Sequence, residues 1–480
     1  MSNKTSGFKR AIGIVLGVIT MLVLIALFVV LVMAPIPNIW VDKVAASDNA
    51  IDQTVSPTQS ETYCPAPIGL ADTGTYGDSA FQATVGNLST QARYAAFGSV
   101  YSATVSAIGQ KSSSDDVTLK DADSTDDSSV KTGAQKINQG ARLINTRMLQ
   151  AAAGTGTVGT IASWADDGDV RGISAASCVS TSLSQSFLLS DSTTGTTQQL
   201  IVSNLSTKPT TVDIAVWGSE TAGKMALSTQ STLSVPAEGE SSMELSAAVD
   251  GQHGLFVTVS SKETPIASVV RTVTMDGLTP KGSDFALPLP TASNASVAPS
   301  ITAGDAVTAY LFAKADTSTG LSWITAKGLV PAKDATVTAD KVTAIDLGEA
   351  PDGALGVMST AEDAVSFSVK ATRSGDSGQA DFALVNAGEP SEFSGLALPD
   401  GVKAITLANT SNARRTVTLR AYDDAGASVT SKEITLDANA AQTIEAGNLS
   451  GDHGTAVVLM LEDSSKKVSW GARFSHDSLQ

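Results

Sequence analysis

The stretch SNLSTKPTTVDIAVW, residues Ser203–Trp217, decides the fold class, because it returns as ANTSNARRTVTLRAY at Ala408–Tyr422. In each copy an Asn and a polar linker precede a segment in which apolar side chains alternate with others. The alternating side chains are Val212, Ile214 and Val216 in the first copy and Val417, Leu419 and Ala421 in the second. A period of two is typical of a half-buried strand. The pattern predicts repeated β units.

A second phrase gives the length of the repeat. Ser186–Leu189, Asp284–Leu287 and Asp381–Leu384 read SFLL, DFAL and DFAL and are spaced by about one hundred residues. A unit of about 100 residues with several short strands has the size of a β-sandwich, whereas propeller blades repeat every 40–50 residues or so. The expected fold is all-β, with tandem immunoglobulin-like β-sandwich domains after an N-terminal transmembrane helix.

The repeats divide the chain into expected segments. These are a cytoplasmic tail (1–10), a transmembrane helix (11–33), a flexible stalk (34–62), a divergent β domain with a disulfide and an acidic insertion (63–183), and three β-sandwich repeats (184–281, 282–378 and 379–480). Each repeat is expected to close its own core, so that the domains form a rod leading away from the membrane.

The N-terminal segment predicts the topology. Ala11–Met33 carries no charge and as a helix would span roughly 35 Å, against about 30 Å for the hydrocarbon core of a bilayer. Lys4, Lys9 and Arg10 stand before it, which places the N-terminus in the cytoplasm and the body outside the cell membrane. A cleaved signal peptide is the alternative, but its apolar region is usually only about 7–15 residues long.

Charge and cysteine content restrict the partners. The formal net charge is −17 and only 16% of residues are charged, so the chain lacks the concentrated basic surface that binds nucleic acid. The expected contact with the membrane is through residues 11–33. Cys64 and Cys178 are the two cysteines, and both lie in the exported part, where oxidising conditions favour a disulfide between them. A catalytic thiol is the alternative.

Candidate chemical motifs are few. Gly154–Gly159 reads GTGTVG, but a dinucleotide site needs a strand before these glycines and a helix after them. His253, His453 and His476 supply little material for a metal site or a triad. The acidic insertion holds Asp121, Asp123 and Asp127, which could bind calcium loosely but lack the Gly and distal Glu of a calcium loop. We therefore predict no catalytic, cofactor or metal site.

Three segments carry a resemblance to a known family: YCPAP at Tyr63–Pro67, GDVRGISAASC at Gly168–Cys178 and LIVSNLSTKPTTVDIAVW at Leu200–Trp217. On these segments the chain resembles an uncharacterised family of membrane-anchored exported proteins from actinobacteria, a domain of unknown function. It departs from that pattern after Cys178, where SLSQSFLL replaces a Trp-Phe and Gly-rich phrase. The resemblance implies an envelope role in association with a membrane glycosyltransferase, and it carries over no catalytic residue.

These observations favour a non-catalytic, membrane-anchored cell-envelope protein that acts as an accessory or scaffold for envelope assembly. Two alternatives stay open. One is a surface adhesin or carbohydrate-binding receptor, which a clustered aromatic face would favour. The other is an envelope hydrolase or transferase, which a cleft with close carboxylates of perturbed pKa would favour.

Overall fold

A computed structural model describes residues 19–26, 59–71, 82–110, 113–122, 130–451, 454–476 and 479. The chain divides into two compact units, Met1–Ser56 and Pro57–Gln480. In the first unit the described residues 19–26 are helical, and they lie inside the expected transmembrane segment 11–33. The rest of that segment, the tail 1–10 and nearly all of the stalk 34–62 lie outside the described residues. Within the described ranges, no helix is both long enough and apolar enough to cross a bilayer.

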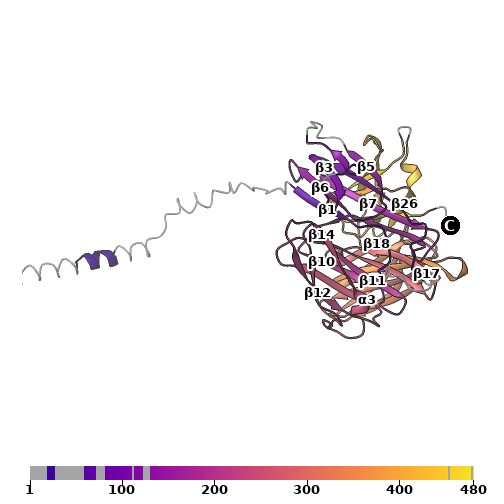
Figure 1. Ribbon diagram of the computed structural model, residues 1–480, viewed down its shortest axis with the longest axis horizontal. Helices are drawn as coiled ribbons and strands as arrows, with labels where there is room; N and C mark the ends of the chain where they lie inside the picture. The colour runs from indigo at the N-terminus through magenta and orange to yellow at the C-terminus, as the bar shows by residue number, and fades with distance from the viewer. Residues whose placement is uncertain are drawn as a thin grey trace, which may run out of the picture. The chain divides into compact units, whose positions relative to one another are not determined.

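The second unit is all-β, as the alternating pattern predicted (Figure 1). Its described strands form four successive sandwiches. The first consists of β1 (Gln59–Cys64), β2 (Ser89–Phe97), β3 (Val100–Ala107), β4 (Val117–Lys120), β5 (Lys131–Lys136), β6 (Arg142–Met148), β7 (Gly156–Ala165), β8 (Gly172–Ser177) and β9 (Val179–Ser180). Its sheet β4-β3-β6-β1-β9 packs on the sheet β5-β2-β7-β8.

The second sandwich follows directly. It consists of β10 (Ser184–Leu189), β11 (Thr196–Asn204), β12 (Thr210–Trp217), β13 (Thr232–Val235), β14 (Gly239–Glu244), the short helix α3 (Leu245–Ala248), β15 (Leu255–Ser261), β16 (Ala267–Asp276) and β17 (Thr279–Ala286). The sheets are β10-β15-β12-β13 and β14-β11-β16-β17, and the alternating Val212, Ile214 and Val216 of β12 point into the core between them.

The third sandwich shares one long strand between its two layers. It consists of β18 (Ser293–Pro299), β19 (Ala306–Ala313), β20 (Thr317–Thr325), β21 (Gly328–Val337), β22 (Thr343–Glu349), β23 (Ala354–Ser374), the 3-10 turn η2 (Asp376–Gly378) and β24 (Ala380–Asn386). The first half of β23 pairs with β18 and β20, and its second half pairs with β19 and β24.

The fourth sandwich repeats the plan of the second. It consists of β25 (Phe393–Ala397), β26 (Val402–Asn409), β27 (Arg415–Tyr422), β28 (Ser428–Leu436), β29 (Ala441–Glu445), the 3-10 turn η3 (Ala446–Leu449), β30 (Val458–Glu462) and β31 (Val468–Phe474). Its sheets are β25-β30-β27-β28 and β29-β26-β31.

The strand order differs from that of an immunoglobulin domain. In the second sandwich the first strand, β10, pairs with β15, and β16 pairs with β11. The fourth sandwich has the same plan, because β25 pairs with β30 and β31 pairs with β26. An immunoglobulin domain instead pairs its first strand with its second. In the fourth sandwich the last strand, β31, also pairs with β26 and not with the penultimate strand β30, as the last strand of an immunoglobulin domain would. The sandwich architecture and the size of the unit therefore agree with immunoglobulin domains, but the order of the strands does not.

Two of the expected boundaries fall close to edge strands, β17 and β24. β17 runs across the expected limit at 281/282 and pairs with β16 of the second sandwich. β24 follows the limit at 378/379 but pairs with β23 of the third sandwich. The repeated DFAL phrases thus form the last strand of one sandwich rather than the first strand of the next.

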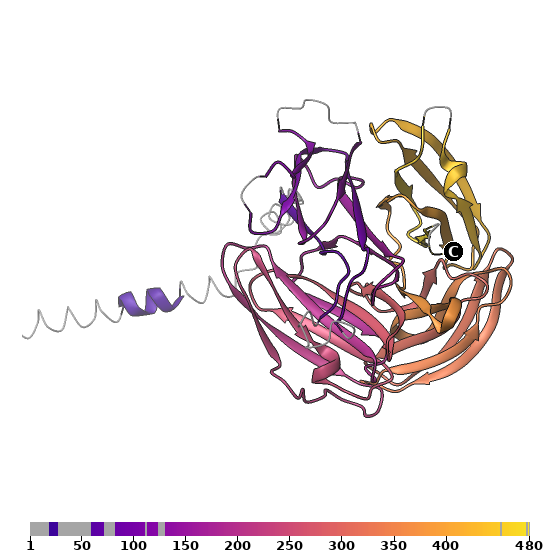
Figure 2. The same cartoon turned by 45° about the vertical axis from the view of Figure 1, so that its right-hand side comes forward.

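The sandwiches contact one another in a closed circuit, so the expected rod is wrong (Figure 2). Apolar clusters lie at each successive interface and also between the fourth sandwich and the first. Representative pairs are Tyr63 and Phe285 (first and second), Phe256 and Phe312 (second and third), Ile324 and Ala441 (third and fourth), and Phe97 and Val458 (fourth and first). The sheets therefore bury apolar side chains on both faces, which a rod of separate domains would not require.

Candidate functional site

A cavity of about 1180 Å³ lies where the four sandwiches meet. Its wall includes residues of the edge strands β8, β17, β24, β25 and β31, which together come from every sandwich. An edge strand leaves part of its backbone N–H and C=O groups without a neighbouring strand. Such groups are costly to bury unpaired, so polar side chains are needed where these edges converge.

Asp284 supplies two of these bonds. It belongs to β17, and it is almost completely buried, with 6% of its surface exposed. Its carboxyl accepts one hydrogen bond from the backbone N–H of Ala175 in β8 at 3.2 Å and another from that of Leu384 in β24 at 2.8 Å. A single side chain of the second sandwich therefore joins edge strands of the first and the third.

Asp381 makes the reciprocal connection. It stands at the start of β24, and its carboxyl accepts hydrogen bonds from the backbone N–H groups of Ile173 in β8 at 2.8 Å and of Phe382 at 2.9 Å. The backbone of Ser283 in β17 also interacts favourably with its ionised form. The two carboxyls thus connect the same three strands, each from a different sandwich.

Two glycines make room for Asp381. A Cβ atom added to Gly172 or to Gly282 would lie 2.6 or 2.8 Å from the nearest oxygen of the Asp381 carboxyl. The φ angle is +132° at Gly172 and +107° at Gly282, values that other residues rarely adopt. Side chains at these positions would therefore displace the carboxyl that ties the strands together.

Both carboxyls have perturbed acidities. Burial raises the pKa of Asp284 to about 8, and the like charge of Asp381 adds to that effect. Burial also raises the pKa of Asp381 to about 7, although backbone hydrogen bonds oppose the change. Removing a carboxylate from water disfavours its charge, and here that effect outweighs the stabilising hydrogen bonds.

Asp305 behaves in the opposite way at the interface of the third and fourth sandwiches. Burial opposes its ionisation, but hydrogen bonds from Arg473 and Thr302, together with the charges of Arg473 and Arg373, hold the pKa of Asp305 below its usual value. Arg473 reaches the carboxyl from β31 at 2.9 Å and Arg373 reaches it from β23 at 2.8 Å. The carboxylate is therefore an ionised bridge between two sandwiches.

The rest of the wall has aromatic and hydroxyl groups. Trp470 is partly exposed, and its indole Nε1–H donates to Ser394 Oγ at 2.7 Å, which fixes the ring. Two buried hydroxyls of the wall, Thr160 Oγ1 and Ser300 Oγ, have no hydrogen-bond partner among the described residues. A molecule in the cavity would find an aromatic face there, whereas the two hydroxyl oxygens are covered by protein atoms.

A family described as being of unknown function, DUF5719, matches residues 130–447, about two thirds of the chain. The chain belongs to DUF5719. The matched region contains the whole second and third sandwiches and both Asp284 and Asp381. This match confirms the part of the predicted resemblance that concerned a family of unknown function. No curated protein matches the chain.

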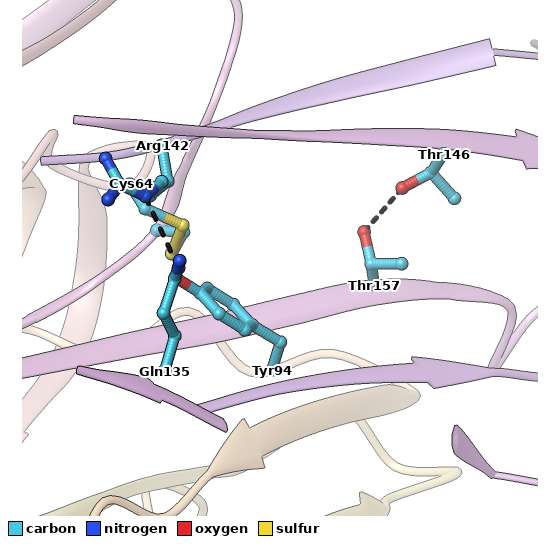
Figure 3. The surroundings of a disulfide bond; sticks show 7 residues. Cys64, Tyr94, Gln135, Arg142, Thr146 and Thr157 are labelled. Carbon is cyan, nitrogen blue, oxygen red and sulfur yellow. Dashed lines mark hydrogen bonds between the residues drawn. A yellow bond between two sulfur atoms is a disulfide. The ribbon is translucent and has the colours of Figure 1, made fainter. Parts of the chain in front are cut away.

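The structure contains the disulfide expected between Cys64 and Cys178. In this DUF5719 member the bond joins the end of β1 to the residue after β8 and so links the two layers of the first sandwich (Figure 3). Tyr94 lies beside it, and Gly159 of β7 leaves the space it needs, because a Cβ there would lie 2.5 Å from Cys178 Sγ. No free cysteine is found among the described residues.

Other residues singled out in the sequence lie apart from the cavity or outside the described residues. Gly156 and Gly159 belong to β7, so a strand rather than a helix follows the first glycine of GTGTVG. His253 is exposed, with its Nε2 atom 3.9 Å from a carboxyl oxygen of Glu220, whereas the His476 ring stacks on Trp164 with ring centroids 4.7 Å apart. His453, Asp123 and Asp127 are outside the described residues. In the parts of the chain that are described, no group of acidic, His or Cys side chains could hold a metal ion.

Sequence reasoning overlooked Asp284 and Asp381 as site residues. Both begin a DFAL phrase, and we used those phrases only to measure the repeat. An Asp that recurs directly before the apolar residues Phe-Ala-Leu was the available signal, because a buried charge is retained only where hydrogen bonds or a function support it. The first copy has Ser186 at that place.

Proposed function

We propose that this DUF5719 member is a non-catalytic, membrane-anchored cell-envelope protein whose closed body is an accessory or scaffold for envelope assembly. One observation carries the proposal. The acidic groups at the centre of the body, Asp284, Asp305 and Asp381, are each engaged in bonds that join different sandwiches. A side chain already used in this way contributes to rigidity rather than to contact with a substrate.

The sequence supports the location and the class of partner. The uncharged run 11–33 with its basic flank favours a single-pass anchor with a cytoplasmic N-terminus, and a disulfide favours an extracytoplasmic body. The resemblance to membrane-anchored actinobacterial proteins implies an envelope glycosyltransferase as partner. We infer that the second, third and fourth sandwiches are repeats of one unit that is immunoglobulin-like in size and layering, and that the first sandwich is a divergent β domain.

Specific observations also favour each of the alternatives. The fixed, partly exposed ring of Trp470 in a large cavity favours a carbohydrate-binding receptor. The neighbouring carboxyls of Asp284 and Asp381, with raised pKa values, favour an envelope hydrolase or transferase. Against the enzyme, Asp284 is buried and each of its oxygens already accepts a backbone hydrogen bond.

Topology and partnership can be tested on the full chain in its own membrane. Protease added to intact cells stripped of their wall should digest the body, and protection of the C-terminal half would refute the location. Chemical crosslinking of membranes followed by purification of the chain should recover an envelope-building membrane enzyme.

The same crosslinking on an Asp381→Asn chain separates the scaffold from the enzyme. A scaffold should recover its partner and sustain envelope assembly with this substitution, because Asn retains an oxygen for the Ile173 N–H. Loss of envelope assembly by a chain that folds and still recovers the partner would favour the enzyme.

A further inference from the structure

Three of the four sandwiches build one of their sheets on the same plan. The strand orders are β5-β2-β7-β8 in the first sandwich, β14-β11-β16-β17 in the second and β22-β19-β23-β24 in the third. In each sheet the chain turns back after the third strand and adds a fourth, and these fourth strands, β8, β17 and β24, line the central cavity. The corresponding sheet of the fourth sandwich is β29-β26-β31, and no strand among the described residues pairs with the other edge of β31.

The unpaired edge of β31 faces the cavity. Six consecutive residues, 470–475, line the cavity wall, and consecutive residues can do so only along a strand edge, because neighbouring side chains point to opposite faces. The space ends at Ser469, whose Oγ donates to the carbonyl of Gly388 at 3.2 Å. After β31 the ring of His476 stacks on Trp164 of the first sandwich, so the chain leads away from this edge there.

Ala472 of β31 is less buried than its equivalent in the second sandwich. Ala472 faces Ile405, which lies four residues before the recurring Asn of the repeat. Val270 of β16 faces Leu200, which lies at the same distance before the first copy of that Asn, so the two positions correspond. Val270 is fully buried, whereas Ala472 and Trp470 pack against the core of the fourth sandwich but remain partly exposed. A strand added beside β31 would remove this apolar surface from water.

The second and third sandwiches show which side chain fits opposite Ala472. Val270 faces Ala286 of β17, and both lie in the core of the second sandwich. In the third sandwich Val369 of β23 faces Val385 of β24, and both contact the core. The residue opposite Ala472 should therefore be apolar and either small or β-branched.

The next residue of the receiving strand is a cation in all three sandwiches, namely Arg271, Lys370 and Arg473. Arg271 faces Phe285, and Lys370 faces Leu384. The long stem of such a cation can lie along an apolar neighbour while its charge stays in a polar environment. An antiparallel segment beside β31 should therefore carry a large apolar residue opposite Arg473, directly before the small or β-branched one.

We propose that the unpaired edge of β31 is the docking site of a partner polypeptide, which adds an extended segment antiparallel to β31 and completes the ring of inner strands β8, β17 and β24. In this mode of recognition the backbone hydrogen bonds of the edge supply affinity, and the alternating side chains supply specificity. A second copy of this chain is a poor donor, because its β17 and β24 are already paired and joined to β8 through Asp284 and Asp381. That the partner belongs to the envelope-building machinery rests on the proposed scaffold function.

A peptide with the sequence TPKGSDFAL, residues 279–287, is the probe, because most of it is β17, which occupies the equivalent position in the second sandwich. The full chain in detergent micelles should bind the labelled peptide, measured by fluorescence anisotropy. Hydrogen exchange measured by mass spectrometry should slow at least about tenfold in β31 and stay unchanged in β28, an edge strand of the other sheet. The same sequence joined to Gln480 by a flexible linker has a higher effective concentration and should also protect β31.

Two changes make the test specific. The peptide TPKGSDAFL, in which Phe and Ala are exchanged, should bind at least about tenfold more weakly, because its Phe would overfill the space opposite Ala472. Ala472→Glu in the full chain should weaken binding to a similar extent, because the added strand would bury an unpaired charge. Ala438→Glu, in the exposed turn after β28, is the matched control and should bind normally. If Ala472→Glu fails to fold, the exchanged peptide decides.

Several results would overturn the proposal. They are a lack of protection of β31 by both the free and the joined peptide, protection of β25 in place of β31, and equal binding of the exchanged peptide. A dimer of the chain that itself protects β31, detected by analytical ultracentrifugation, would identify a second copy as the occupant and would also refute it. A chain that binds the probe but recovers no envelope enzyme after crosslinking would refute the class of partner and leave the docking edge in place.

Discussion

Asn204 and Asn409 show how single side chains build the repeated unit. Each is fully buried at the end of a strand. The Asn204 amide donates to the carbonyls of Lys208 and Pro236, and its oxygen accepts the N–H of Ser206. Asn409 makes the same three contacts with Ala413, Asp437 and Ser411. The Asn that recurs in the sequence is therefore explained by a turn that needs its amide.

Replacement of either Asn by Ala should be costly. Asn204→Ala or Asn409→Ala leaves buried backbone groups without a partner, which should lower the free energy of unfolding by about 2–3 kcal/mol. Chemical denaturation followed by circular dichroism would measure the change. Asn412→Ala is the control, because Asn412 is exposed and should change stability by less than about 0.5 kcal/mol. Equal effects of all three substitutions would contradict this explanation.

Gly159 is a second residue whose identity is set by its contacts. An added Cβ would meet Cys178 Sγ at 2.5 Å and the Tyr94 ring at 2.9 Å. Gly159→Ala should therefore destabilise the first sandwich by about 1–3 kcal/mol through overpacking. Gly447→Ala adds its Cβ to open space and should be nearly neutral by thermal unfolding. If the two variants melt alike, the packing around the disulfide is looser than these distances indicate.

At the scale of elements, β8 combines several structural roles. It pairs with β7, it precedes Cys178, and its outer edge donates to Asp284 and Asp381. The disulfide ties the end of β8 to β1, so it also positions the edge that the two carboxyls hold. The disulfide and the hydrogen bonds to Asp284 and Asp381 thus restrain the same short strand. Loss of the disulfide should therefore weaken these hydrogen bonds.

Removal of the disulfide tests that coupling. The Cys64→Ser, Cys178→Ser double variant frees a loop with a sequence separation of 114 residues, which the chain-entropy model equates with roughly 4–5 kcal/mol. Thermal unfolding should begin in the first sandwich, and hydrogen exchange should increase in β8 and at the amide of Leu384 in β24. Exchange that increases only around Cys64 would show that the disulfide and the carboxyls act separately.

At the scale of the whole body, the interface of the fourth and first sandwiches closes the circuit. Arg93 forms an ion pair with Asp400 at 3.3 Å, and the rings of Phe97 and Tyr422 meet edge to face with centroids 6.4 Å apart. A surface ion pair contributes little, so most of the stabilisation comes from the apolar contacts around Phe97. These contacts join parts of the chain that are more than 300 residues apart in sequence.

Separated fragments should therefore associate. The fourth sandwich has a core of its own, but without the rest of the body it would expose Val458 and Tyr422 on one side and Ala408 and Ala441 on the other. We expect fragment 389–480 to fold with a β-type spectrum and to bind fragment 57–388 in a one-to-one complex, measured by analytical ultracentrifugation. Phe97→Ala in the larger fragment should weaken this complex. Two folded fragments that do not bind each other would contradict the closed circuit.

Features that depend on neighbouring residues could be predicted from the amino-acid sequence alone. The period-two alternation around Val212 and Val417 predicted strands, and the repeat near one hundred residues predicted sandwiches. The expectation that both cysteines lie outside the cell membrane predicted the disulfide. Local patterns identify these features because strand pleating and turn chemistry are properties of short segments.

Tertiary structure alone decided how the sandwiches meet. Pairing of β10 with β15 instead of β11, closure of the circuit at Phe97, and convergence of Asp284 and Asp381 on β8 all join residues that are far apart in the chain. Alternation shows that a strand has a buried face but not which sheet covers it. The outer faces of the sandwiches were therefore expected to be exposed, and a rod of separate domains was predicted. An Asp in a strand likewise has no evident role until the edge it faces is known.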